Sequence, residues 1–494
     1  MRTVIFLLAF ATATFLASLA VPILVGLAHG ETERVARLAV LAATGAFVSV
    51  VTMAASFGYR HVLTPDRLIL SMVFVWLVLS LIGSVPFMLV AGLPFDAALF
   101  ESVSGLTTTG ATTFGLREAL PQSVIFWRLQ LEWIGGFLTL ASLFLVLSPL
   151  AIGGLPRRAM AAEFNLDKNG ARDAGIEHLW RYLPLLAYYL AASVVVFFLF
   201  VASGADSLGA AQLTMTSIST GGFNPYDTDL GARHGLPTLL VMGSVLMISA
   251  TSLFWQRYDL FNPLRVVWQN REARWVVLVV AVMTALYVLA FRNVGAGSGT
   301  GGIGAVLVDS YFAAASVVAT SGHETRPGVI ALLPEIFVFS VALVGAAVFS
   351  TASGLKVHRL GAMLIQSFRE LSLLIYPSSV IPMRIAKAEY DERSIVESWP
   401  VMLLLLMVTA VSVFMLASGQ GSFEAALLSG VALMINAGPL YEAYVPAVAD
   451  PELWPGFRDF SGFERLAACI VMLLGRLEFV AVFAILNFKY WLSR

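Results

Sequence analysis

The sequence predicts an all-α membrane protein with many spanning helices, and two observations carry that prediction. Of its 494 residues, 59% are hydrophobic and only 12% are charged, whereas soluble domains carry about 25% charged residues. Apolar runs of about 20 residues, the length that crosses a bilayer as a helix, recur along the whole chain. The single cysteine, Cys469, excludes an internal disulfide framework and is expected to be a buried small side chain.

No catalytic motif accompanies these apolar runs. The six histidines form no H-x-x-x-H pair, and neither a Walker sequence nor a G-x-S-x-G nucleophile elbow occurs. The sequence therefore predicts that this chain is not an enzyme and binds no cofactor.

The chain opens with a helix hairpin, expected near 3–28 and 34–57 and assigned to a first region, 1–60. The first 20 residues resemble a signal peptide that ends in small side chains. The apolar run nevertheless continues to Ala28 and so reaches full spanning length. We therefore expect an uncleaved first helix.

After the hairpin, one pattern occurs four times: a long apolar helix, a short helix, a glycine-containing loop and a second long helix. The first long helices are expected near 67–90, 179–203, 274–292 and 398–417. The short helices are expected near 95–106, 206–219, 304–319 and 422–435, and the second long helices near 121–150, 236–256, 330–350 and 464–487. The short helices cannot cross a bilayer, so each is expected to be re-entrant. The four units are assigned to 61–160, 161–262, 263–375 and 376–494.

The loop of each unit carries a glycine, and these are Gly110, Gly221, Gly322 and Gly438, at intervals of 111, 101 and 116 residues. Irregular backbone at membrane depth is tolerated only where it lines a cavity inside protein. Oxygen-rich loops of this kind replace the hydration shell of a cation in a channel. We therefore predict one filter built by four loops around a pseudo-fourfold axis. Its candidate ion-binding residues are Thr108, Thr109, Gly110, Thr220, Gly221, Thr320, Ser321, Gly322, Asn436, Ala437 and Gly438.

The distribution of Lys and Arg sets the expected orientation. Most of the 30 basic residues fall in segments that are cytoplasmic if the N-terminus is inside, which satisfies the positive-inside rule. This orientation predicts ten spanning helices, cytoplasmic termini and four loops that enter from the outside. The cytoplasmic connections near 151–178 and 356–395 are too short for a separate core and are candidate docking surfaces for another protein.

Six stretches spread over nearly the whole chain resemble the Trk/Ktr/HKT superfamily of cation transporters, and the TrkH-type membrane subunit in particular. They are D-A-A-L-F-E-S-V-S-G-L-T-T-T-G-A-T (Asp96–Thr112), W-R-L-Q-L-E-W-I-G-G (Trp127–Gly136), S-I-S-T-G-G-F (Ser217–Phe223), S-T-A-S-G-L-K-V-H-R (Ser350–Arg359), I-N-A-G-P (Ile435–Pro439) and G-R-L-E (Gly475–Glu478). The resemblance implies K⁺ uptake across the cytoplasmic membrane of a bacterium, with K⁺ bound at the filter residues. It also implies a homodimer and a cytosolic nucleotide-binding regulatory protein of the TrkA or KtrA kind.

The residues around the third glycine leave the ion open. Ser321 precedes it, and His323 and Glu324 follow it, where relatives usually have Thr and an apolar aromatic. These last two side chains either titrate at the outer mouth or are solvated loop residues. A Na⁺ or poorly selective cation transporter of the same fold is therefore the alternative. An organic-solute secondary transporter is a remote alternative, because it would need charged or aromatic ligands at mid-membrane.

A segment of small and hydroxyl side chains, Ala346 to Gly354, interrupts the last helix of the third unit. In the family the matching segment is an intramembrane loop below the filter that gates the pore. The alternative is a face of small residues that packs helices together. The gate residues that the resemblance implies are Ser350, Thr351, Ala352, Ser353, Gly354 and Lys356.

Arg476 lies in the middle of an apolar run, where an ionised side chain normally faces a cavity or a partner. Below the filter it would act as an electrostatic barrier to cations that the gating loop modulates, and we include it among the gate residues. The alternative is a structural ion pair with Glu132 or Glu478. Trp127 and Trp133 are expected to be packing or interface residues.

Overall fold

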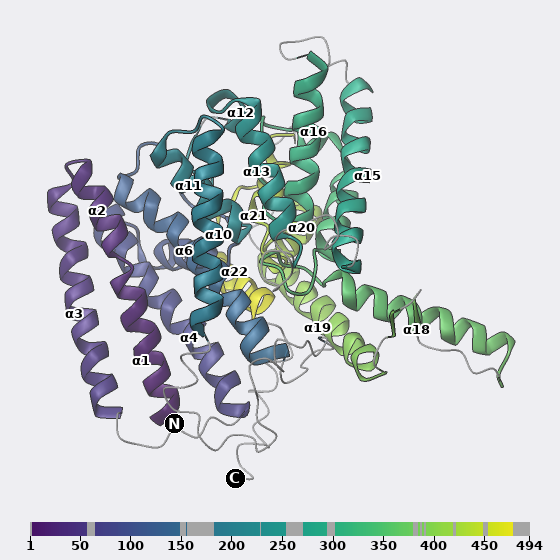
Figure 1. Cartoon of the computed structure of the whole chain (residues 1–494), viewed down its shortest axis with the longest axis horizontal. Coiled ribbons are helices and arrows are strands. Elements are labelled where there is room, and N and C mark those ends of the chain that lie inside the picture. The colour runs from purple at the N-terminus through teal and green to yellow at the C-terminus, as the bar shows by residue number, and fades with distance from the viewer. Residues whose placement is uncertain are drawn as a thin grey trace.

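The computed structural model describes residues 2–56, 65–148, 155, 182–227, 229–252, 270–293, 302–378, 384–385, 388–389, 392–417, 421–447 and 453–477. These residues are helical apart from loops and one short antiparallel pair, β1 (Arg384–Ile385) with β2 (Ala388–Glu389). The helices stand side by side as a bundle, and α18 (Val357–Ile375) projects sideways from it (Figure 1). The predicted all-α class is confirmed.

The N-terminal hairpin lies at one edge of the bundle (Figure 1). Its first half is two helices, α1 (Arg2–Ala17) and α2 (Ala20–Ala28), and its second half is α3 (Thr32–Ser56). The predicted helix over 3–28 is therefore broken near Ser18. Pro22 has no N–H to donate to the Ser18 carbonyl, and Gln130 Nε2 donates to that oxygen instead at 2.8 Å.

The four predicted units follow in order. Their first long helices are α4 (Pro65–Pro86), extended by a π-helical turn at Phe87–Ala91, α10 (Tyr182–Ala202), α15 (Arg271–Asn293) and α19 (Glu392–Leu416). Their short helices are α5 (Phe95–Leu106), α11 (Ser207–Ser219), α16 (Gly302–Val318) and α20 (Phe423–Met434). Their second long helices are α6 (Gln122–Ala141), continued by a π-helical stretch at Ser142–Leu147, α13 (Leu236–Ser249), α17 (Glu335–Val344) and α22 (Gly462–Arg476). The remaining helical pieces are α12 (Leu230–Arg233), α21 (Gly438–Glu442) and the 3-10 turns Ile330–Leu332, Val445–Ala447 and Phe457–Asp459.

The largest difference from the predicted boundaries is in the third unit. A helix over 330–350 was expected, but α17 ends at Val344. Gly345 then takes a left-handed φ of 68°, and a Cβ there would lie 2.3 Å from the Ser353 carbonyl oxygen. Residues 345–356, called the inner loop from here on, separate α17 from α18. In the other units α13 ends at Ser249 and α22 at Arg476, and residues 253–260 and 478–494 lie outside the described ranges.

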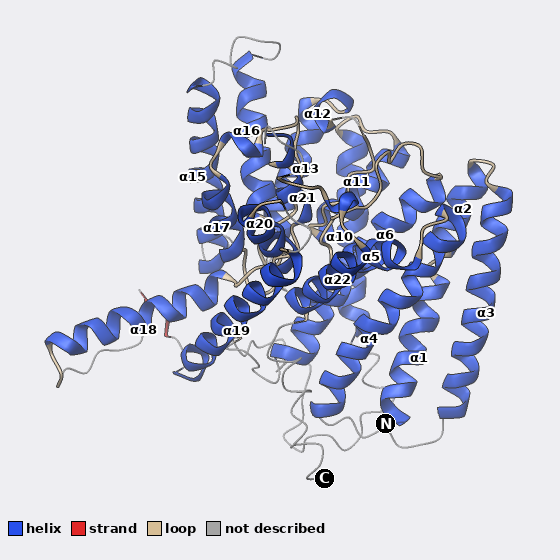
Figure 2. Cartoon of the chain, turned by 180° about the vertical axis from the view of Figure 1, so that it is seen from behind, coloured by secondary structure: helices blue, strands red, loops and turns tan. Residues whose placement is uncertain are grey.

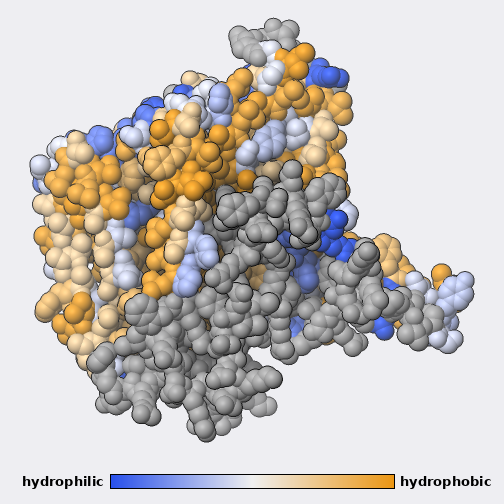
Figure 3. Space-filling view, in the orientation of Figure 1, coloured by the Kyte–Doolittle hydropathy of each residue, from blue (hydrophilic) through white to orange (hydrophobic). Residues whose placement is uncertain are grey.

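Long helices form the outside of the bundle, and short ones form its inside. Seven stretches among the described residues are long and apolar enough to cross a membrane: Arg2–Ala28, Thr32–Ser56, Arg67–Ala91, Gln122–Leu147, Leu183–Ala202, Arg271–Arg292 and Ile395–Leu416. Hydrophobic side chains cover much of the outer surface (Figure 3). Seen from behind, α5 and α22 lie centrally in the bundle (Figure 2), and α22 packs against both α5 and α20. Trp127 and Cys469 are buried, as expected of packing residues.

Candidate functional site

The loops that follow the four short helices share one backbone conformation. They are named loop 1 (after α5), loop 2 (after α11), loop 3 (after α16) and loop 4 (after α20). One non-glycine residue in each takes a left-handed φ: Thr108 at 56°, Thr220 at 54°, Thr320 at 57° and Asn436 at 50°. The next N–H donates to the carbonyl five residues earlier, from Thr109 to Ser104, Gly221 to Thr216, Ser321 to Ser316 and Ala437 to Ala432. Left-handed φ is costly for a β-branched residue, so its occurrence at the same step of each loop marks equivalent positions.

This register shows which glycines are equivalent. The residues two places after the left-handed ones are Gly110, Gly222, Gly322 and Gly438. Gly221, the predicted filter glycine of loop 2, is instead equivalent to Thr109, one step earlier. Loop 2 has two consecutive glycines, so the sequence pattern alone could not separate them.

The four equivalent glycines form a closed ring, called the glycine ring below. A Cβ on Gly110 would lie 2.3 Å from Gly222 Cα, one on Gly222 would lie 2.8 Å from Ser321 O, one on Gly322 would lie 2.6 Å from Leu440 N, and one on Gly438 would lie 2.7 Å from Ala111 N. Each loop therefore touches the next, and loop 4 returns to loop 1, where Gly438 N donates to Thr109 O at 2.8 Å. Only glycine fits where backbones approach this closely.

A buried ion pair supports loop 1 from behind. The Glu101 carboxylate of α5 accepts hydrogen bonds from Thr113 N at 2.5 Å and Thr112 Oγ1 at 2.8 Å. Arg128 of α6 lies 3.1 Å from the same carboxylate, and its guanidinium stacks 4.1 Å from the centroid of the Phe223 ring. Because Phe223 belongs to loop 2, the pair ties the first two loops together.

A second carboxylate supports loop 2. Glu132 Oε1 of α6 accepts from the backbone N–H groups of Gly222 at 2.8 Å and Phe223 at 2.7 Å. A Cβ on Gly221 would lie 2.3 Å from this carboxylate, so the loop fits against Glu132 only because position 221 is glycine. Glu132 is fully buried.

His323 connects loop 3 to the same cluster. Its Nε2 lies 3.1 Å from Thr216 Oγ1 of α11, and the side chain is buried. The expectation of a solvated loop residue is therefore wrong for His323. Glu324 is half-buried and accepts from the N–H groups of Ile330 at 2.8 Å and Gly328 at 3.3 Å, and burial raises its pKa to about 7.

The inner loop contacts the left-handed residues of three loops. Ser353 N donates to Thr320 Oγ1, and Ser353 Oγ donates to Asn436 Oδ1, each at 3.1 Å. Thr220 Oγ1 donates to Thr351 Oγ1 at 3.3 Å. Each of these three loops thus runs from the inner loop at its left-handed residue to the glycine ring two residues later.

Arg476 of α22 binds this inner loop directly. Its guanidinium donates to Ser353 Oγ at 2.5 Å and to the Thr351 carbonyl at 2.7 Å, while Nε donates to Thr139 Oγ1 at 2.7 Å. No ion pair joins Arg476 to Glu132 within the described part of the chain, and Glu478 lies outside it. The predicted proximity of Arg476 to the inner loop is therefore present in the structure.

Lys356 folds back onto the inner loop at its far end. Its Nζ donates to the Ala352 carbonyl and lies 3.5 Å from Ser350 Oγ. Val348 N donates to the Glu272 carboxylate of α15 at 3.0 Å, so both ends of the loop are fastened. Gly354 closes it with a left-handed φ of 92°. All the predicted gate residues thus lie in one buried cluster beneath the four loops.

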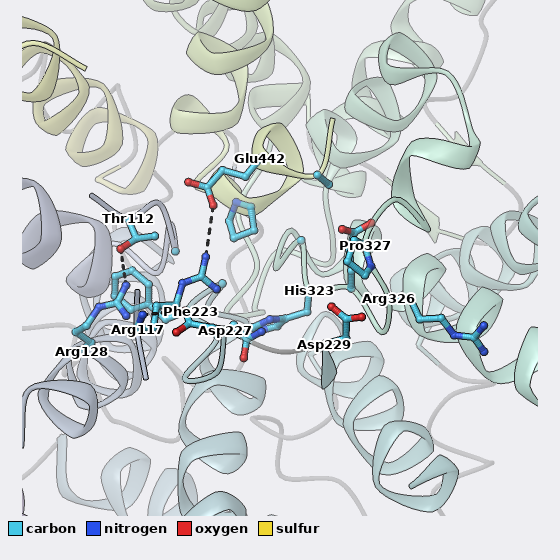
Figure 4. Close-up of a pocket in the computed structure, with 17 residues that line it drawn as sticks. Thr112, Arg117, Arg128, Phe223, Asp227, Asp229, His323, Arg326, Pro327 and Glu442 are labelled. Atoms are coloured by element: carbon cyan, nitrogen blue, oxygen red, sulfur yellow. Dashed lines mark hydrogen bonds and ion pairs between the residues drawn. The ribbon is translucent and has the colours of Figure 1, made fainter. Parts of the chain in front are cut away.

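On its other side, the glycine ring forms the floor of a cavity of about 230 Å³ (Figure 4). Three ring glycines line it, Gly110, Gly222 and Gly322, together with Pro439. Its walls carry charged side chains, Arg117, Arg128, Asp227, Asp229, Glu324, Arg326 and Glu442. Except for Glu324, they were not among the residues that the sequence singled out at the mouth. Arg128 and Glu132 had a detectable signal, because charges are unexpected inside the apolar run of α6.

Comparison with known proteins gives one consistent result. The TrkH family profile, described as cation transport protein, matches residues 38–256. The Trk system potassium uptake protein TrkH of Halomonas elongata is 28% identical over 451 residues, which cover 87% of each chain. Its namesake in Escherichia coli K12 is 28% identical over 85% of each chain. The crystal structure of the potassium transporter TrkH from Vibrio parahaemolyticus has the same fold, with a TM-score of 0.82 and 23% identity over 99% of each chain.

Proposed function

Since the chain is a Trk-type transport protein and not an enzyme, we propose that it carries K⁺ into the cell through a filter made by loops 1 to 4. The closed glycine ring is the observation that carries this proposal. Relatives that match over most of their length are named potassium uptake proteins. The four units 61–160, 161–262, 263–375 and 376–494 supply one loop each, behind an N-terminal hairpin at 1–60.

The chemistry of the ring suits a dehydrated alkali cation. Its candidate ligands are backbone carbonyls and hydroxyls of residues 108–110, 220–222, 320–322 and 436–438, with no charged side chain among them. The short helices α5, α11, α16 and α20 end at these loops, so the partly negative ends of their dipoles face the ion. Neutral oxygens and helix ends stabilise a cation without binding it too tightly to leave.

The inner loop is the proposed gate. It lies beneath the filter residues, and its contacts there are hydrogen bonds between neutral groups. Arg476 holds Ser353 and Thr351 in place and adds a positive charge on the inner side of the filter. A membrane potential of 100 mV contributes roughly 2.3 kcal/mol per charge to inward cation movement once this loop yields.

A cytosolic partner is the proposed trigger. The inner loop continues directly into α18, which projects from the bundle on the side that the basic residues predict to be cytoplasmic (Figures 1 and 2). A nucleotide-binding regulatory protein of the TrkA or KtrA kind that moved α18 would pull on Lys356 and thereby on the gate. We further infer a homodimer in the cytoplasmic membrane of a bacterium, with both termini in the cytoplasm.

The decisive experiment is the uptake of ⁸⁶Rb⁺ and ²²Na⁺ into proteoliposomes that contain the purified chain. We expect Rb⁺ uptake to exceed Na⁺ uptake at least about tenfold, because four equivalent glycines shape the ring. Equal uptake would favour the poorly selective alternative, and a preference for Na⁺ would favour the Na⁺ transporter. Uptake of neither ion, with the chain correctly inserted, would contradict the proposal.

A further inference from the structure

Arg117 places a permanent positive charge over the mouth of the proposed filter. It follows loop 1 and lines the cavity whose floor is the glycine ring. Its side chain reaches across this cavity toward Glu442 of α21 (Figure 4). A fixed cation at the outer end of a cation pathway opposes the transported ion, so its presence there calls for a functional explanation.

The backbone around Arg117 is fixed to the second unit. The carboxylate of Asp227 accepts from Arg117 N at 2.8 Å and from Glu118 N at 2.9 Å. The guanidinium also lies 3.4 Å from the Tyr226 carbonyl oxygen. The position of the charge is therefore set by the fold and is not that of a freely moving surface side chain.

The charge of Arg117 is less neutralised than those of its neighbours. Arg128 lies 3.1 Å from Glu101, and Arg326 lies 2.8 Å from Asp309, so each has a close carboxylate. Arg117 reaches the carboxylate of Glu442 only at 3.9 Å, and both side chains of this pair are about one quarter exposed. Of the three guanidinium groups in the cavity, Arg117 thus contributes most to its potential.

The other charges of the cavity explain why such a residue is useful. Four carboxylates line it, those of Asp227, Asp229, Glu324 and Glu442. Coulomb energy is proportional to the charge of the ion, so these carboxylates attract Mg²⁺ or Ca²⁺ twice as strongly as K⁺. A nearby guanidinium repels divalent ions twice as strongly as monovalent ones by the same rule.

We propose that Arg117, held over the glycine ring by Glu442, is a specificity-determining residue that keeps divalent cations from occupying and blocking the outer mouth. This inference rests on the proposed cation pathway. Charged side chains at the mouth of a pore are a known means of setting which ions enter. Glu442 limits the repulsion so that monovalent cations still pass.

The test is block of ⁸⁶Rb⁺ uptake by external Ba²⁺ in proteoliposomes. In the Arg117→Gln variant we expect the Ba²⁺ concentration for half-maximal block to fall at least about tenfold relative to the wild type. Arg117→Lys keeps the charge and is expected to stay within about threefold of the wild type. Arg233→Gln is the matched control, because Arg233 is a half-exposed arginine outside the cavity that stacks on Tyr226.

Three outcomes would overturn the inference. Unchanged Ba²⁺ block in Arg117→Gln, with normal Rb⁺ uptake, would refute the role of Arg117 and leave the proposed function intact. An Arg117→Lys variant as sensitive as Arg117→Gln would show that shape matters and charge does not. Absence of Rb⁺ uptake by the wild type itself would remove the cation pathway, and this inference with it.

Discussion

The two sides of the glycine ring are built from different interactions. Behind the ring, the buried carboxylates of Glu101 and Glu132 each accept two or more hydrogen bonds from loops 1 and 2. Beneath it, the inner loop contacts the filter residues through single hydrogen bonds between hydroxyl, amide and backbone groups. Bonds to buried charges contribute about 1.5–3 kcal/mol each, and neutral ones about 0.5–1.5. The difference suits a fixed filter above a loop that moves.

The largest effect is expected at the ring itself. Gly110→Ala would place a Cβ 2.3 Å from Gly222 Cα at a position where φ is 73°. Neither backbone can yield without opening the ring, so we expect Rb⁺ uptake to fall at least about a hundredfold. Uptake into proteoliposomes measures it, with insertion checked by protease protection.

Gly115→Ala is the matched control, a few residues further along from α5. A Cβ at Gly115 would meet nothing within 4 Å, so near-normal uptake is expected. Equal uptake by the two variants would show that the closed ring does not conduct ions.

A smaller effect is expected from the support behind loop 2. Glu132→Ala leaves the N–H groups of Gly222 and Phe223 without their shared acceptor. Because an unsatisfied buried donor costs about 1–3 kcal/mol, loop 2 should lose its fixed position. We expect the ratio of Rb⁺ to Na⁺ uptake to fall at least about tenfold while the protein still inserts.

Glu33→Ala provides the comparison for this variant. Glu33 forms an exposed pair with Arg37 on α3, away from the ring, so its removal should leave the ion ratio unchanged. If Glu132→Ala kept the wild-type ratio, the buried carboxylate would be a packing feature only.

Much of this architecture could be predicted from the sequence because it depends on local patterns. A dozen-residue amphipathic segment between an apolar run and a glycine-containing loop predicts a short helix over 95–106, and α5 has these bounds. Small and hydroxyl side chains likewise predict an interruption after α17, but not the residue at which it begins. The left-handed turn at Gly345 depends on a close approach to Ser353, which no local pattern reveals.

The support of the ring depends on distant pairs, which the sequence does not reveal. Glu101 and Arg128 are 27 residues apart in sequence, yet they form one buried pair. The sequence suggests Glu132 only as a partner for Arg476, because a buried acid and a buried base invite that pairing. In the structure Glu132 binds loop 2 and Arg476 binds the inner loop. Charge patterns show that a partner must exist without showing which one.

The smallest effect is expected at the gate. Arg476→Ala removes the donors to Ser353 Oγ and the Thr351 carbonyl, which frees the inner loop from α22. It also removes a positive charge on the inner side of the filter. Basal Rb⁺ uptake without any partner protein should therefore rise, by about threefold to tenfold.

A double-mutant cycle separates the charge of Arg476 from its hydrogen bonds. Ser353→Ala alone removes the contacts to Arg476 and Asn436 but leaves the charge in place. If Arg476 acts by holding Ser353, the double variant should have about the same uptake as Arg476→Ala alone, because the two changes break one interaction. If it acts only through its field, the two effects should multiply. Uptake identical to the wild type in all three variants would instead make Arg476 a structural residue and leave the inner loop without a latch.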